Sequence, residues 1–220
     1  ITSEELIRLA TEARRGGMIS GKAGLVTMHM GIGKKRLQPV LDAINESDVP
    51  IKVFVPTHIN LRSPELLEDC IGFTELGGTI DFTAAFSPED NEVEAEKIMK
   101  LLDRGVDASL ITVSSDAFGS QPRFDDKGNC LGLTYSTPET LMQLLKALVS
   151  KGMLLEQALQ FFTANPARIM GLEGVKGVVM EDADADLLAL DKELNITHVI
   201  AKGKLAMKDE KIIMKSKFEL

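Results

Sequence analysis

GLVTMHMG, at residues 24–31, is an apolar run that ends in a histidine, and two later runs in the chain repeat the pattern. VPIKVFVPTHIN at residues 49–60 ends in a second histidine, and SLITVSSDAFGSQP at residues 109–122 has an aspartate where its apolar part stops. Each run is rich in β-branched residues and bounded by Gly, Pro or Asn, which is typical of strands buried in a parallel sheet. The three runs therefore predict an α/β fold with a parallel sheet.

The residues at these strand ends are His29, His58 and Asp116. The carboxyl ends of parallel strands carry the chemistry of such folds, because the scaffold is rigid while the loops vary. Imidazole and carboxylate groups suit a zinc-like divalent ion. Each residue alone has an ordinary alternative: a core histidine for His29, a loop histidine for His58 and a turn cap for Asp116. Their equivalent positions favour a shared site, where we expect all three to converge.

The composition is that of a globular, acidic chain. With 220 residues and 44% hydrophobic content it can bury a substantial core, and no run of about 18 apolar residues could span a membrane. The net charge of −8 and the pI near 5.0 argue against nucleic acid or an anionic membrane as a partner. The two cysteines, Cys70 and Cys130, form no CxxC pair and predict reduced thiols in a cytoplasmic protein.

Helical patterns alternate with the predicted strands. Residues 2–17 begin with a capping box formed by Thr2 and Glu5, and residues 63–78 begin with Ser63 as N-cap and Pro64 at the first helical position. In the helical pattern at residues 34–48, Pro39 must lie near the start of the helix or kink it. The remaining helical patterns are at residues 91–105, 137–152 and 154–172, and a further strand is at residues 79–86.

Four β/α units within about 135 residues correspond to half of a TIM-type (β/α)₈ barrel, because a complete barrel takes about 250 residues. We predict a half-barrel with its terminal helices over residues 1–173, followed by the C-terminal part of a small β-sandwich over residues 174–220. A half-barrel leaves a sheet edge uncovered, and the chain starts at Ile1 directly in a helix. We therefore expect it to be the C-terminal part of a longer polypeptide. An open doubly wound sheet is the structural alternative.

The order of several motifs resembles the C-terminal half of the amidohydrolase superfamily. The strand-end His, His and Asp are followed by TANPARIMGL, GVKGVVMEDADADLLALD and VIAKGKLAMKD. Within the superfamily, TMHMGIGKKRLQPVLD, VPTHIN, GGTIDFT and VSSDAFGSQPRFDDKGN are similar to stretches of the isoaspartyl (β-aspartyl) dipeptidases. The resemblance covers all 220 residues. The TxNPAxxxGL pattern is strong for the superfamily but silent on substrate, whereas SSDxxGSQPxFDDxGN is the specific part.

The resemblance implies a hydrolase with two divalent metal ions, of which zinc is the expected metal. By motif match, His29 and His58 would bind one ion and Asp116 the other, with a hydroxide bridging the two. The family's remaining ligands are an HxH pair and a carboxylated lysine, and the chain has no HxH, since its third histidine is His198 in the tail, which we interpret as structural. The resemblance therefore places the rest of the metal site on the N-terminal half of the same polypeptide.

The resemblance also implies a reaction and a substrate. Asp116 would act as general acid and base in hydrolysing the isopeptide bond of a small β-aspartyl dipeptide. Ser120 would bind the substrate's free carboxylate. The family's arginine after PTHxN is shifted by one position here, to Arg62, which becomes the second candidate for that contact. We further expect a homo-oligomer, with no nucleic-acid or membrane partner.

Two other interpretations stay open. Another amidohydrolase, such as a dihydroorotase-like or N-acyl-amino-acid hydrolase, would share the barrel and the metals. A metal-free structural homologue is the non-enzymatic alternative, which the presence of all three ligand-type residues disfavours. Metal analysis and a dipeptide panel distinguish these interpretations.

Overall fold

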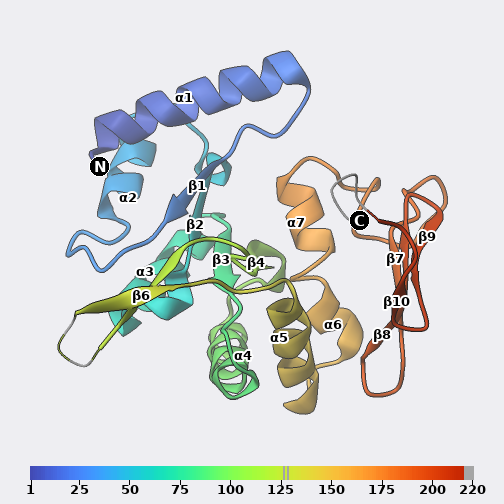
Figure 1. The fold of residues 1–220 in the computed structure, drawn as a ribbon. Coiled ribbons are helices and arrows are strands. Elements are labelled where there is room, and N and C mark those ends of the chain that lie inside the picture. Colours follow the sequence, from blue (N-terminus) through green and yellow to red (C-terminus); the bar gives the residue numbers. More distant parts are fainter. Residues whose placement is uncertain (126, 128, 216–220) are drawn as a thin grey trace.

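The computed structural model describes residues 1–125, 127 and 129–215 as a mixed α/β structure (Figure 1). A long first helix, α1 (Ser3–Ser20), precedes four short strands, each followed by a helix, and the predicted β/α alternation is thereby confirmed. The strands are β1 (Val26–His29), β2 (Phe54–Thr57), β3 (Ile80–Thr83) and β4 (Ile111–Ser114). The helices that follow them are α2 (Gln38–Asn45), α3 (Pro64–Glu75), α4 (Pro88–Asp103) and α5 (Glu139–Ser150).

The helices begin where their capping residues predict. Thr2 and Glu5 form the expected capping box at the start of α1, in which the Thr2 side chain accepts a hydrogen bond from the Glu5 N–H. Ser63 accepts from the Leu66 N–H at the start of α3. Pro39 is the second residue of α2, a position that needs no N–H donor, so it starts this helix without kinking it.

The four strands form two parallel pairs. β1 pairs with β2 in the register Val26 to Phe54, and β3 pairs with β4 in the register Ile80 to Ile111. Within the described part of the chain no backbone ladder joins β2 to β3. Side chains connect β2 to β3 across this boundary, which we call the seam: the Thr57 hydroxyl of β2 donates to the Asp81 carboxylate of β3 at 2.5 Å.

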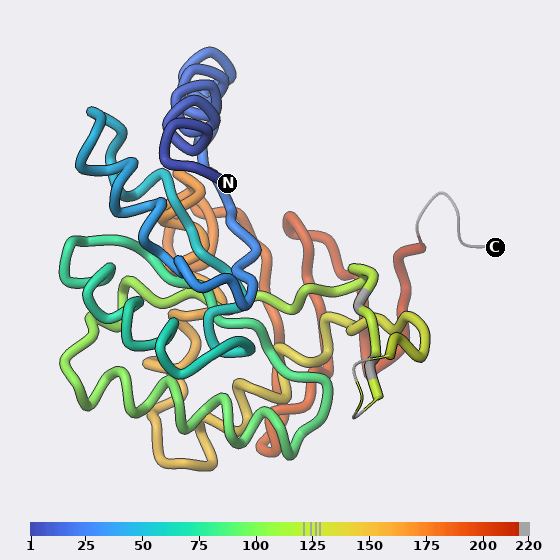
Figure 2. The backbone as a smooth tube through the Cα atoms, turned by 90° about the vertical axis from the view of Figure 1, so that its left-hand side faces the viewer, coloured from blue at the N-terminus to red at the C-terminus, as the bar shows by residue number. Residues whose placement is uncertain are grey.

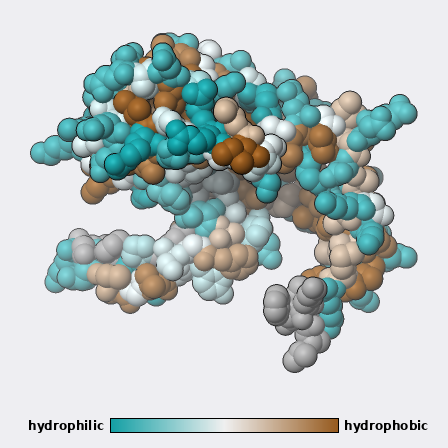
Figure 3. All heavy atoms as spheres, turned by 90° about the horizontal axis from the view of Figure 1, so that it is seen from above, coloured by the Kyte–Doolittle hydropathy of each residue, from teal (hydrophilic) through white to brown (hydrophobic). Residues whose placement is uncertain are grey.

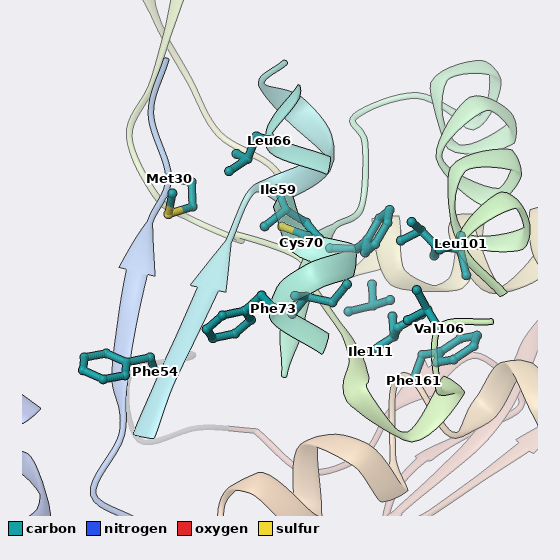
Figure 4. Close-up of a cluster of buried hydrophobic side chains, with 14 of the residues drawn as sticks. Met30, Phe54, Ile59, Leu66, Cys70, Phe73, Leu101, Val106, Ile111 and Phe161 are labelled. Carbon is teal, nitrogen blue, oxygen red and sulfur yellow. The ribbon is translucent and has the colours of Figure 1, made fainter. Parts of the chain in front are cut away.

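One apolar core lies between the strands and the helices that cover them (Figure 4). Its largest fully buried side chains include Phe54, Phe73, Phe82 and Phe161. Cys70 is fully buried among them, as its place in the helical pattern predicts, and burial raises the pKa of its thiol to about 12. Both cysteines are free thiols. The core thus fixes the strand ends from which the candidate site residues extend.

A β-hairpin that the sequence does not predict follows β4. Its strands are β5 (Gln121–Phe124) and β6 (Cys130–Thr134), which pair antiparallel. The hairpin projects from the body of the molecule in two perpendicular views (Figures 1 and 2). At its base the rings of Phe118 and Tyr135 stack with centroids 6.1 Å apart. Two residues of the motif that carries the dipeptidase resemblance, Asp126 and Gly128, lie outside the described residues.

The C-terminal part contains two short helices and one antiparallel sheet. The predicted helix over residues 154–172 is divided into α6 (Leu155–Leu159) and α7 (Ala164–Ile169), because Thr163 between them leaves the helical conformation. The predicted tail strands form a sheet in the order β10-β9-β8-β7, with β7 (Leu187–Leu190), β8 (Ile196–Ala201), β9 (Lys204–Lys208) and β10 (Lys211–Ile212). The half-barrel, the division at residue 173 and the sandwich stay predictions.

The surface seen from above is dominated by hydrophilic residues, with hydrophobic residues in small patches around a central hollow (Figure 3). Among the described residues, none of the helices combines the length and the apolar character needed to cross a membrane.

Candidate active site

His29 is the last residue of β1, and its ring meets that of His58. The Nδ1 atom of His29 lies 2.8 Å from the Nε2 atom of His58, and the two ring centroids are 4.7 Å apart. The contact follows from the parallel pairing of β1 with β2, which places the ends of both strands at one edge of the sheet. The structure therefore brings together two nitrogens that the sequence separates by 29 residues.

His58 follows β2 in a left-handed backbone conformation, with φ of 61°. The turn leads into a short 3₁₀ helix, Ile59–Leu61, whose Leu61 N–H donates to the His58 carbonyl at 3.1 Å. The side chain is 3% exposed. Its second ring nitrogen, Nδ1, lies 2.7 Å from the Thr83 hydroxyl of β3. Both ring nitrogens thus have partners, and the ring orientation is fixed from two sides.

Asp116 lies two residues after β4 and also adopts a left-handed conformation, with φ of 48°. The Ser136 hydroxyl donates to its carbonyl at 3.0 Å and holds this turn against the chain that follows the hairpin. A Cβ atom at Gly119 would lie 3.1 Å from the Asp116 Oδ1 atom, so the glycine leaves room for the carboxylate.

All three predicted ligand residues line one cavity of about 410 Å³. Its walls come from all four parallel strands and from α7, and include Thr27, Thr57, Asp81, Thr112, Ser114 and Met170. Ser120 is exposed and is not among the residues that line this cavity. Arg62 does not line this cavity either: its Nε atom donates to the Met30 carbonyl at 2.7 Å, and its side chain lines a separate pocket.

The electrostatics of the cavity favour a neutral His58. Burial lowers the pKa of His58, and the neighbouring His29 and Arg62 side chains lower it further, while the carboxylates of Asp116 and Asp81 oppose this shift. A neutral imidazole has a lone pair for a metal ion, whereas a protonated ring has none. His58 is therefore held in the charge state that a metal ligand requires.

Residues 52–206 match the sequence model of the amidohydrolase family. The chain belongs to this family.

Two solved structures of β-aspartyl dipeptidase from Fervidobacterium islandicum AW-1 are similar to this amidohydrolase over its whole length. One, in complex with the β-Asp-Leu dipeptide, is 36% identical with a TM-score of 0.87, and the other is 31% identical with a TM-score of 0.83. The chain spans 57% and 55% of these two proteins. A Xaa-Pro dipeptidase with bound methionine, 18% identical over 93% of this chain and 48% of its own, has a TM-score of 0.58 and shows the shared fold.

One buried carboxylate that lines the same cavity, Asp81 on β3, was not predicted from the sequence. Asp81 accepts hydrogen bonds from the hydroxyls of Thr57 at 2.5 Å, Thr112 at 2.7 Å and Ser114 at 2.6 Å. Burial raises the pKa of Asp81, and the three hydroxyl donors work against that rise. An acidic residue inside the apolar run TIDFTAAF was the available signal, since a charge there needs buried partners.

The third histidine lies in the tail of the amidohydrolase, as predicted. His198 is on β8, with Nδ1 3.1 Å from the Thr197 hydroxyl and Nε2 3.7 Å from the Asp209 carboxylate. It is not among the residues that line the cavity. Its interactions are those of a strand residue that pairs across the sheet to β9.

The donor set of the amidohydrolase suits part of a divalent-metal site. The His29 Nδ1 and His58 Nε2 atoms lie 2.8 Å apart in the cavity that Asp116 also lines, and imidazole and carboxylate groups are ligands for such an ion. Within residues 1–125, 127 and 129–215, no group of three or more His, Cys, Asp or Glu is arranged to hold an ion on its own.

Proposed function

We propose that this amidohydrolase hydrolyses the isopeptide bond of β-aspartyl (isoaspartyl) dipeptides. The observation that carries the proposal is its likeness, over 100% of the chain, to a β-aspartyl dipeptidase in complex with β-Asp-Leu. The cavity supports the same proposal, because its histidines and aspartate are the groups that a metal-dependent hydrolase uses. We also propose that the four β/α units form half of a TIM-type barrel, with this cavity at the strand ends.

We propose two divalent ions, with zinc as the metal, as the cofactors. His29 and His58 would hold one ion, and Asp116 would hold the other. When bound, such ions lower the pKa of a coordinated water and polarise the carbonyl of the scissile bond. The contact of His58 Nδ1 with the Thr83 hydroxyl supports this assignment, since it leaves Nε2 directed toward His29.

Asp116 would transfer the proton in this reaction. Its carboxylate accepts a proton from the attacking water as the new C–O bond forms, and gives that proton to the departing nitrogen as the C–N bond breaks. An amine leaves poorly without such a proton. The space left by Gly119 supports the role, because it gives room to the carboxylate of a residue that lines the cavity.

Ser120 and Arg62 are the proposed contacts for the substrate's free carboxylate. The Nε atom of Arg62 is held by the Met30 carbonyl, and the two Nη groups have no other partner among the residues that the structure describes. A guanidinium anchored at Nε can still present two donors to a carboxylate. The exposed side chain of Ser120, beyond the cavity, would reach the same group when a dipeptide extends outward.

A panel of substrates tests the proposed function. The intact protein should hydrolyse β-Asp-Leu, leave α-Asp-Leu, dihydroorotate and N-acetyl amino acids intact, lose activity with a chelator and regain it with Zn²⁺. Product analysis with metal quantification measures each point. Hydrolysis of dihydroorotate or an N-acetyl amino acid in place of β-Asp-Leu would move the protein to another amidohydrolase activity. Absence of every activity in metal-loaded protein would favour a non-enzymatic homologue.

We expect Arg62→Ala and Ser120→Ala each to lower kcat/KM for β-Asp-Leu about tenfold or more. The reason is that a charge-assisted hydrogen bond to a carboxylate contributes roughly 1.5–3 kcal/mol. Arg36→Ala is the matched control, because its guanidinium is engaged by Asp69 and Arg36 is not among the residues that line the cavity. An unchanged kcat/KM for Arg62→Ala would assign the carboxylate contact elsewhere.

A further inference from the structure

The backbone of His58 needs support from its surroundings. A left-handed conformation is unfavourable for a residue with a Cβ atom and persists only where neighbouring contacts hold it. His58 adopts this conformation, with φ of 61°, between the end of β2 and the 3₁₀ turn. Because no backbone ladder joins β2 to β3 in the part of the chain that the structure describes, side chains make the contacts between these two strands.

The side chain of Asn60 supplies this support. Its Oδ1 atom accepts a hydrogen bond from the Thr83 N–H at 2.9 Å, and its Nδ2 atom donates to the Thr83 carbonyl at 2.9 Å. The side-chain amide thereby pairs with both backbone groups of one residue, as a neighbouring strand would. Asn60 is 7% exposed, so these bonds are shielded from water.

Helix α4 fixes the direction of the Asn60 amide. The second N–H of Nδ2 donates to Glu94 Oε2 at 2.7 Å, and Glu94 is 5% exposed. Lys97 neutralises this buried carboxylate, since its Nζ atom donates to Glu94 Oε1 at 2.8 Å and to the Asn60 carbonyl at 2.9 Å. A carboxylate accepts only from the NH₂ end of the amide, so Oδ1 must face the Thr83 N–H.

The held residue, Thr83, is also the one that contacts the His58 ring. Its hydroxyl lies 2.7 Å from His58 Nδ1, and the opposite nitrogen, Nε2, lies 2.8 Å from His29 Nδ1. We propose that Asn60 is a positioning residue, which acts through Thr83 to hold the His58 imidazole in the orientation that binds metal. This inference rests on the proposed metal-dependent function and names the residue that supports its ligand. Partners that orient a metal-binding histidine typically change metal affinity 10- to 100-fold when removed.

A second asparagine offers a matched control. Asn91 makes the same pair of bonds to one backbone residue, with Oδ1 accepting from the Ala85 N–H at 2.9 Å and Nδ2 donating to the Ala85 carbonyl at 2.9 Å. It is fully buried, and no histidine is among its hydrogen-bond partners in the part of the chain that the structure describes. Asn60→Ala and Asn91→Ala therefore remove equivalent bonds, and only the first lies on the path to His58.

The test measures Zn²⁺ affinity by chelator competition and the visible absorption of bound Co²⁺ in the intact protein, without a dipeptide. We expect Asn60→Ala to weaken Zn²⁺ binding about 10- to 100-fold and to change the Co²⁺ spectrum, because the ligand geometry loosens. Asn91→Ala should leave the Zn²⁺ affinity within about threefold of wild type and the Co²⁺ spectrum unchanged, while it lowers the stability of the protein about as much as Asn60→Ala does. Equal weakening in the two variants, or none in Asn60→Ala, would overturn the proposal.

Variants of Thr83 cover the case in which Asn60→Ala does not fold. Thr83→Val keeps the volume and the backbone bonds to Asn60 but removes the hydroxyl, and should weaken Zn²⁺ binding as Asn60→Ala does. Thr83→Ser restores the hydroxyl and should restore affinity. Unchanged affinity in Thr83→Val would refute the path through this residue. Metal binding that depends on these residues without β-Asp-Leu hydrolysis would reject only the substrate proposal.

Discussion

Asp116→Asn is expected to lower kcat for β-Asp-Leu by roughly 100- to 10,000-fold, because an amide can neither accept nor return the proton. Folding should be unaffected, since asparagine tolerates the left-handed conformation that Asp116 adopts. Steady-state kinetics together with metal content and thermal unfolding measure the effect.

The control for this change is Asp182→Asn. Asp182 is an exposed aspartate with a φ of 67°, so the same substitution occurs in a similar backbone conformation outside the cavity. Its kcat should match that of wild type. Near-normal turnover of metal-loaded Asp116→Asn would show that another group carries the proton.

His58→Ala is expected to abolish both metal binding and activity. The substitution removes Nε2, the nitrogen that faces His29, and leaves the Thr83 hydroxyl without its ring partner. Metal quantification after dialysis, combined with kinetics, measures both losses. His29→Ala should have the same effect, because the two nitrogens serve one ion in the proposed site.

His198→Ala separates this effect from a general loss of histidine. His198 is half-buried on β8 and is not among the residues that line the cavity. Its removal should keep metal content and turnover at wild-type levels. Full metal content in His58→Ala would mean that the site lies elsewhere.

Local patterns predicted most of the fold of the β/α region. The strands that lead to His29, His58 and Asp116 are recognisable because they are continuous apolar runs, and the helices because Thr2 and Ser63 cap them. The parallel topology then places the strand ends together. The same reasoning placed Cys70 in the core before the packing was known.

The hairpin after β4 could not be predicted in the same way. β6 carries mostly exposed side chains, so it has no buried face from which a period of two could be recognised. Its strand conformation comes from pairing with β5 across a turn. The break between α6 and α7 was missed for a related reason, since Thr163 leaves the helix within an otherwise helical pattern.

The supports of the candidate site were beyond the reach of the sequence because their partners are distant. Asn60 and Thr83 are 23 residues apart, and Asn60 and Glu94 are 34 apart. No local pattern shows which polar side chain will meet which backbone group. Such residues become recognisable only when the packing brings their elements together.

At the seam between β2 and β3, the two strand pairs are joined by side chains, so the contact between the pairs depends on which residues stand there. A backbone ladder forms with almost any side chains, so the pairings of β1 with β2 and of β3 with β4 tolerate many substitutions. The seam is joined by Thr57 to Asp81 and by Asn60 to Thr83, and each link depends on the identity of its residues. We therefore expect single substitutions at these positions to change the separation between the strand pairs while each pair keeps its own register.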